Sequence, residues 1–267
     1  NDLTVNALQI GSGAEALLLS IALADRINLY RTEKARAQRE LIESLEEKTN
    51  MQHQMLELEA KALRSQMNPH FIFNCMNSIK ALIQQKEEDK AVSYLTTFSK
   101  LLRTILQNLD KREISLFDEI ETCRLYTQLE SMRFGNKFSY SFCVDPELDI
   151  KSTQVPALIL QPFIENAIWH GLMPKEEEGH IKVSVQKKDE SIVCIVDDNG
   201  IGRELSTKYK FKHQSSTHQS KGVKLTQSRL DLDNALHNRS AGVITIDKKD
   251  ENGNATGTTV MVSFDEY

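Results

Sequence analysis

The stretch QPFIENAIWHGL, residues 161–172, places a polar pair inside an otherwise apolar helical pattern. Helical spacing puts Glu165 and Asn166 one turn before Trp169 and His170. A buried polar group without partners costs roughly a few kcal/mol, so this pair requires partners in the folded protein. The phosphates and Mg²⁺ of a bound nucleotide would supply them. The structural alternative is a helix whose polar side caps a neighbouring element.

A second string, VDDNGIG at residues 196–202, follows an apolar strand pattern. Gly200 and Gly202 permit tight turns and a close approach of the backbone to a ligand. The Asp198 carboxylate would accept hydrogen bonds from an amino group at the floor of a pocket. Further along, Gly257 and Thr258 open the last expected strand. Each of these short patterns is weak by itself.

A third string, LRSQMNPHFIFNCMNSIKALI at residues 63–83, contains a histidine directly after a proline. Pro69 removes an intrahelical hydrogen bond and is expected to bend the helix just before His70. The bend would leave the imidazole exposed, and neutral imidazole is a nucleophile near pH 7 that can accept a phosphoryl group. Taken alone, a histidine on an amphipathic helix such as His70 is more often structural than catalytic.

Helical patterns dominate the first half of the chain. Residues 31–66 lack Gly and Pro and carry an imperfect heptad repeat, which predicts a weak parallel coiled coil or a solvated helix. Residues 67–109 predict a helical hairpin that turns at 84–90, and two copies of it would form a four-helix bundle. The stripe expected to join the copies includes Phe71, Ile72, Ile79, Leu95, Phe98 and Leu102. Ser115 is expected to begin a further helix that runs to about Phe134.

From residue 135 the pattern becomes mixed α and β. Alternating apolar residues predict strands at 138–144, 181–186, 192–196, 243–246 and 258–262. Helices are expected at about 156–171 and 223–238. The segment 200–221 shows little periodicity and predicts a lid or a disordered loop.

Composition excludes some functions. The formal net charge of −5 lacks the basic excess that a nucleic-acid-binding surface requires, so no nucleic-acid partner is expected. The cysteines are too far apart for a zinc or redox motif and are expected to be buried free thiols: Cys75, Cys123, Cys143 and Cys194.

The most apolar stretch lies near the N-terminus. Residues 4–24 predict a marginal membrane-spanning helix, because the uninterrupted apolar part is short and Glu15 lies inside it. Basic residues follow between 26 and 39, which places the rest of the chain in the cytoplasm by the positive-inside rule. An amphipathic helix on a soluble protein is the alternative.

Taken together and in this order, PHFIFN (69–74), ENAIWHG (165–171), DNGIG (198–202) and GTTV (257–260) resemble the LytS/YehU-type bacterial sensor histidine kinases. The resemblance covers residues from about 60 to the end. It implies an α+β chain in which a helical dimerisation hairpin, a four-helix bundle as a dimer, precedes a Bergerat-fold α/β sandwich. The N-terminal string at 8–31 also resembles the last helix of a seven-helix membrane receptor module.

The resemblance implies four segments: the end of a membrane helix at 1–30, a coiled-coil signalling helix at 31–66, dimerisation and phosphotransfer helices at 67–136, and an ATP-binding domain at 137–267. His70 would take the γ-phosphate of ATP, and Glu165 would polarise a water or assist the nucleophile. The nucleotide would be held by Asn166 through Mg²⁺, and by His170, Asp198, Gly200, Gly202, Gly222 and Thr258. Lys224 stands where the family usually has a second lid glycine.

The implied partners are a second copy of the chain, the receiver domain of a response regulator, and the bacterial inner membrane, with this region facing the cytoplasm. Two other functions stay open from the sequence: a Bergerat-fold ATPase that drives a conformational cycle, and an inactive scaffold without histidine phosphorylation.

Overall fold

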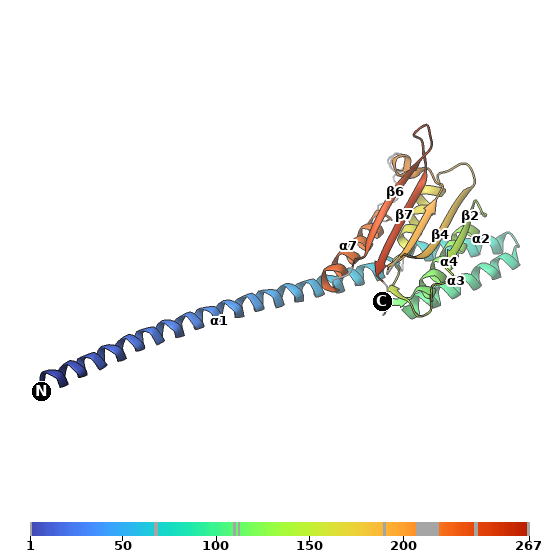
Figure 1. Ribbon diagram of the computed structural model, residues 1–267. Coiled ribbons are helices and arrows are strands. Elements are labelled where there is room, and N and C mark those ends of the chain that lie inside the picture. Colours follow the sequence, from blue (N-terminus) through green and yellow to red (C-terminus); the bar gives the residue numbers. More distant parts are fainter. Residues whose placement is uncertain are drawn as a thin grey trace. The chain divides into compact units, whose positions relative to one another are not determined.

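The computed structural model describes residues 2–66, 69–108, 111, 113–188, 191–206, 219–237 and 240–265 (Figure 1). The chain divides into two units, residues 1–53 and 54–267. The backbone of His70 is described, but its side chain falls outside this description.

The N-terminal unit is helical throughout its described residues. It belongs to α1, Asp2–Gln66, a helix of 65 residues that runs through both segments expected at 1–30 and 31–66. Leu41, Ile42 and Leu45 are exposed on it. Within the described residues, no helix is both long enough and apolar enough to cross a membrane. The coiled coil stays a prediction.

The second unit begins with a helical hairpin of α2, Pro69–Gln84, and α3, Glu88–Asn108. Helix α2 begins at Pro69, whose missing N–H is tolerated in the first turn. The kink expected just before His70 involves residues 67 and 68, which lie outside the described residues. The turn occupies only residues 85–87, where Lys86 adopts a left-handed conformation with φ of 61°. The predicted hairpin is therefore confirmed, with a shorter connection than expected.

Helix α4, Leu116–Arg133, packs against α3 and connects the hairpin to the α/β part of the unit. The Ser115 side chain caps it by accepting a hydrogen bond from the Asp118 N–H at 3.1 Å, which confirms the predicted start. Two strands of three residues each, β1 (Glu113–Ser115) and β3 (Gln154–Pro156), were not predicted; they pair antiparallel beside the start of α4.

A five-stranded sheet in the order β2-β4-β5-β7-β6 forms the rest of the fold (Figure 1). Its strands are β2 (Phe138–Val144), β4 (Gly179–Lys188), β5 (Ser191–Asp198), β6 (Gly242–Lys249) and β7 (Ala255–Asp265). Only the β2–β4 pair is parallel. All five strands were predicted, because alternation makes one face of each strand apolar.

One face of the sheet is covered by the helices. The side chains at Ile192, Cys194 and Val196 of β5 are buried beneath α5 (Gln161–Asn166), the π-helix η1 (Ala167–Leu172) and α7 (Gln219–His237). This layering confirms the predicted α+β class with an α/β sandwich.

Three local predictions were wrong. The helix expected from 156 begins only at Gln161, because residues 157–160 form a turn after β3. The 200–221 segment is not a loop throughout: residues 202–206 are helical and α7 begins at Gln219, while 207–218 lie outside the described residues. Cys143 is exposed, unlike the other three cysteines, because it lies on the side of β2 away from the helices.

Candidate nucleotide-binding site

The sheet side of the candidate site is centred on Asp198, the last residue of β5. Its Oδ1 accepts hydrogen bonds from the Gly200 N–H at 2.8 Å and the Thr258 N–H at 3.3 Å. Burial raises the pKa of Asp198 to about 6, although these donors and the charge of Lys248 oppose the rise. The carboxyl group is therefore oriented by its backbone neighbours and ionised at neutral pH.

Two glycines allow the backbone to close around this carboxylate. A Cβ at Gly200 would lie 2.4 Å from the Gly171 Cα, so the loop after β5 and the helix η1 touch through their backbones. Gly257 has φ of 133°, and a Cβ there would lie 2.0 Å from the Asp198 carbonyl oxygen. Any side chain at either position would push apart the elements that position Asp198.

The helix side of the site comes from α5 and η1. Asn166 is the last residue of α5, and His170 lies one turn further along η1. The Met173 N–H donates to the Ile168 carbonyl at 2.9 Å, the five-residue spacing of a π turn. Both Asn166 and His170 face a cavity of about 320 Å³ between these helices and the sheet.

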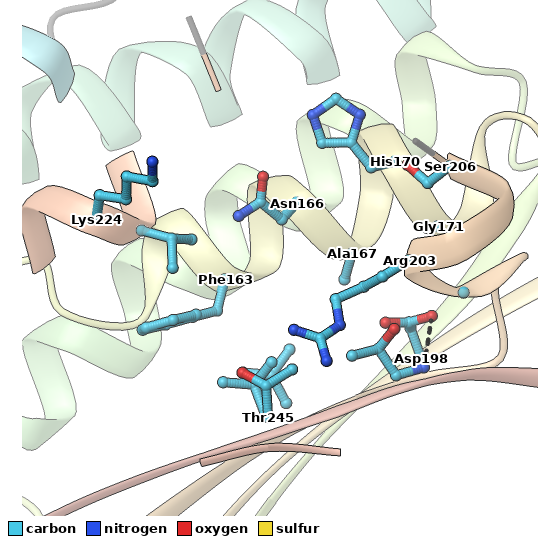
Figure 2. Close-up of a pocket in the computed structure, with 15 residues that line it drawn as sticks. Phe163, Asn166, Ala167, His170, Gly171, Asp198, Arg203, Ser206, Lys224 and Thr245 are labelled. Carbon is cyan, nitrogen blue, oxygen red and sulfur yellow. Dashed lines mark hydrogen bonds between the residues drawn. The ribbon is translucent and has the colours of Figure 1, made fainter. Parts of the chain in front are cut away.

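Cationic and apolar groups complete this cavity (Figure 2). Lys224 and Phe163 lie on one side of it and Asp198 on the other. Arg203 reaches across the sheet and makes two hydrogen bonds of 2.6 Å to the Asp247 carboxylate of β6. The full lining comprises Phe163, Asn166, Ala167, His170, Gly171, Val196, Asp198, Gly202, Arg203, Ser206, Val223, Lys224, Thr245, Thr258 and Val260.

The structure brings most of the predicted nucleotide-binding residues together. The cavity is lined by Asn166, His170, Asp198, Gly202 and Thr258. Gly200 and Gly222 are not among the lining residues. The Gly200 N–H donates a hydrogen bond to the Asp198 carboxylate, and Gly222 directly precedes the lining residues Val223 and Lys224.

Glu165 is not among the lining residues. It accepts a hydrogen bond from the Gln161 side chain at 2.9 Å, and burial raises its pKa to about 7. Burial and, after it, the charge of Glu165 raise the pKa of Tyr126 in α4, and α5 packs against that helix. The Tyr126 ring packs 5.1 Å from that of Phe71, the residue that follows His70.

Sequence reasoning missed Arg203, Ser206 and Thr245 as lining residues. Arg203 directly follows the DNGIG string, but nothing local indicates that it reaches β6. Thr245 occupies the core face of a short alternating strand, where a threonine carries no specific signal. Only the packing of the sheet against the helices identifies these residues.

Comparisons with known proteins find two families along the chain. The histidine kinase family matches residues 58–138, and the family of histidine kinase-, DNA gyrase B- and HSP90-like ATPases matches residues 153–267. The Escherichia coli K12 protein described as "Sensor histidine kinase BtsS" is 35% identical over 145 residues, which cover 53% of this chain and 24% of the relative.

Two proteins described as "Sensor protein LytS" are also similar. The one from Enterococcus faecalis is 36% identical over 55% of this chain and 24% of the relative. The one from Streptococcus mutans is 35% identical over 76% of this chain and 33% of the relative. The chain thus spans about a quarter to a third of the length of these relatives. The two family matches follow one another along the chain, and over these regions the chain is similar to the sensor histidine kinases of the LytS and BtsS type.

Proposed function

We propose that the cavity binds ATP with Mg²⁺ and that the chain transfers the γ-phosphate to His70, within a two-component signalling system. The observation that carries the proposal is the polarity of the cavity: a buried, oriented carboxylate at Asp198 opposes the amide of Asn166 and the ammonium of Lys224. The adenine amino group would donate to the Asp198 carboxylate, and the triphosphate would lie beside Asn166 and Lys224. The volume of about 320 Å³ lies within the range of small-ligand sites.

The fit to Mg²⁺ rests on Asn166. Among the described residues no cluster of three acidic, histidine or cysteine side chains could hold a metal ion. Mg²⁺ does not need one, because in nucleotide sites it keeps several waters and takes most other ligands from the phosphates. Asn166 would supply one amide oxygen, and the bound ion would neutralise charge on the phosphates.

Transfer of the γ-phosphoryl group requires mainly that the nucleophile, His70, is aligned with the γ-phosphorus. An unprotonated ring nitrogen of His70 attacks the γ-phosphorus, an N–P bond forms, and the bond to the β–γ bridging oxygen breaks so that ADP leaves with the electron pair. The proton on the other ring nitrogen then passes to a base. Glu165 suits this role, because its raised pKa of about 7 matches imidazole and its charge acts on Tyr126, which packs on Phe71.

We further propose that the phosphoryl group passes from His70 to an aspartate on the receiver domain of a response regulator. The expected bacterial inner-membrane location, with this region facing the cytoplasm, stays a prediction based on the basic residues between 26 and 39.

One experiment separates this function from its alternatives. Incubation with γ-labelled ATP should leave acid-labile label on the protein, the behaviour of phosphohistidine. Release of free phosphate without labelled protein would instead support an ATPase that cycles between conformations. Neither label nor release would support an inactive scaffold.

The pH dependence of ATP affinity tests the role of Asp198. Its pKa of about 6 means that the carboxylate is ionised above pH 6 and protonated below. Because the adenine amino group donates to the ionised form, affinity should fall as pH drops from 7.5 to 5.5. Asp198→Asn should weaken binding at pH 7.5 by about ten- to a hundredfold, because its NH₂ group cannot replace both acceptor oxygens.

The matched control is Asp197→Asn, which changes the neighbouring carboxylate on the opposite face of β5, where it pairs with Lys248 at 2.8 Å. Isothermal titration calorimetry measures the ATP affinity of wild type, Asp198→Asn and Asp197→Asn from pH 5.5 to 7.5. The control should still lose ATP affinity as the pH falls, with a midpoint shifted by the lost Asp197 charge, whereas Asp198→Asn should lose most of its pH dependence. Equal pH profiles for wild type and Asp198→Asn would contradict the assignment of Asp198 to the adenine.

We propose that two chains associate through the hairpin. Of the stripe expected from the sequence, Ile79 and Phe98 are buried within the chain's own core, while Phe71, Ile72 and Leu102 pack against that core. Leu95 alone of that stripe remains exposed. The exposed apolar residues on the hairpin are Phe73, Met76, Ile83, Val92, Leu95 and Leu106. Apolar residues spaced along a helix face in this way mark an interface.

Phe73→Asp combined with Leu95→Asp should therefore produce monomers. Each side chain contributes about 1.5–3 kcal/mol when buried, so losing two per subunit should weaken the dimer by at least about a hundredfold. Light scattering at micromolar concentration measures the change. The control, Ile246→Asp, alters an exposed apolar residue on the sheet and should stay dimeric. A monomeric wild-type chain that phosphorylates itself normally would refute the dimer.

A further inference from the structure

Glu119 of α4 is a fully buried carboxylate that the proposed reaction does not use. Its exposed fraction is 0%, and its two oxygens accept hydrogen bonds from the N–H groups of Leu158 and Leu160, each at 2.8 Å. Burial raises the pKa of Glu119 to about 7, while these donors and the charge of Arg229 lower it. The two donor N–H groups lie on the turn 157–160, which connects β3 directly to α5.

Arg229 of α7 holds the same turn from another element. It is 7% exposed, and its Nη1 donates to the Ala157 carbonyl at 3.2 Å. The Ala157 carbonyl and the Leu158 N–H belong to one peptide group, whose two dipolar ends point in opposite directions in the trans form. This peptide group is therefore clamped between a carboxylate of α4 and a guanidinium of α7.

The turn has a conformation that needs such support. Leu158 has φ of +62°, in the left-handed region that residues with a side chain adopt at a cost. Its side chain is 2% exposed, so burial and the two-sided clamp together hold it. The residue after the turn, Gln161, begins α5, and the orientation of the turn therefore sets the direction in which α5 starts.

We propose that Glu119 and Arg229 are positioning residues for the nucleotide cavity, which act together by clamping the Ala157–Leu158 peptide group. The inference rests on the proposed ATP binding. The clamped peptide group lies directly before α5, which carries Asn166, and is bonded to α7, which carries Lys224. The two helices also contact each other. Neither Glu119 nor Arg229 lines the cavity itself.

The clamp also gives the hairpin a physical path to the cavity. Helix α4 packs along α3, and Lys100 of α3 pairs with Glu121 of α4 at 2.6 Å. Glu119 lies two residues before Glu121, so a movement of α4 that follows the hairpin must carry the 157–160 turn or break its hydrogen bonds. The same residues thus position the cavity and couple it to the hairpin.

ATP affinity provides the first test, with the whole 267-residue chain. Glu119→Gln should weaken ATP binding about tenfold at a temperature where the protein stays folded, a coupling within the usual range between sites. Arg229→Met should do the same, and Arg229→Lys should recover part of the loss. The Glu119→Gln/Arg229→Met double variant should bind no more weakly than either single variant, because the clamp acts as a unit.

The control for lost stability is Ile105→Val, which truncates a buried residue of α3 far from the turn along the chain. All variants are compared at equal distance below their melting temperatures. Equal ATP affinity in Glu119→Gln and Ile105→Val, or losses that add in the double variant, would overturn the proposal. If Glu119→Gln does not fold, Arg229→Lys, which keeps the charge, is compared with Ile105→Val in its place.

Amide hydrogen exchange without nucleotide separates this proposal from ATP binding. Glu119→Gln should speed exchange in both α5 and α7, two segments far apart in sequence, relative to Ile105→Val. Faster exchange confined to the 157–160 turn would overturn the clamp, whether or not ATP binds. A wild-type chain that binds no ATP would instead contradict the proposed function and leave the exchange result to decide the clamp.

Discussion

Replacing His70 with glutamine is expected to reduce incorporation of label from γ-labelled ATP to the background level while ATP still binds. Glutamine keeps polarity and helix propensity but has no nucleophilic nitrogen, so the N–P bond cannot form. The loss should be at least about a thousandfold, the scale seen when an enzyme nucleophile is removed. Acid lability and alkali stability of the wild-type label would identify phosphohistidine.

His53→Gln is the matched control, because it makes the same change at an exposed position of α1. It should label at the wild-type rate. Titration with ATP should give equal affinities for wild type, His70→Gln and His53→Gln. Acid-labile label that persists in His70→Gln would show that another residue accepts the phosphoryl group, and loss of ATP binding would show that His70 belongs to the cavity itself.

Changing Asn166 to aspartate is expected to lower the initial rate of autophosphorylation by about a hundredfold or more. The substitution replaces a neutral amide with a carboxylate beside the phosphates, where it repels the charge that develops during transfer. Affinity for adenosine, which lacks phosphates, should change little because Asp198 and Thr258 remain in place. Initial rates of label incorporation at several Mg²⁺ concentrations measure the effect.

Asn252→Asp provides the corresponding control, since it makes the same chemical change in the exposed turn between β6 and β7. It should leave the rate unchanged. An Asn166→Asp protein that phosphorylates His70 at the wild-type rate would show that the phosphates lie elsewhere. A parallel loss of affinity for adenosine and ATP would place Asn166 at the adenine end instead.

The proposed coupling between the hairpin and the cavity would act through the helices α5 and η1. Asn166 and His170 extend from one continuous stretch of α5 and η1, and the charge of Glu165 in that stretch acts on Tyr126 of α4. We infer that this stretch of α5 and η1 holds residues for phosphoryl transfer and also receives the movement of the hairpin that controls it. Substitutions at Glu119 or Arg229 should therefore change how well ATP is held without removing any group that touches it.

Several elements follow from the sequence by itself because their causes are local. Alternating apolar residues predicted β2 at 138–144 with the bounds that the structure shows, since the pleat turns successive side chains to opposite faces. Ser115 predicted the start of α4, because its side chain accepts a hydrogen bond from the Asp118 N–H, which has no partner within the helix. The order of the four motif strings likewise predicted which residues would meet around one cavity, and five of them line it.

Only the tertiary structure decided the features that depend on residues far apart in the chain. The left-handed turn at Leu158 breaks the expected helix, because Glu119 and Arg229, from two other helices, hold its peptide group. Arg203 enters the cavity because β6 places Asp247 within its reach. Such positions are set by long-range hydrogen bonds and burial, for which neither local propensity nor spacing carries a signal. The sequence by itself determined most of the elements and where their polar residues stand, whereas packing determined the short strands β1 and β3 and which side chains line the site.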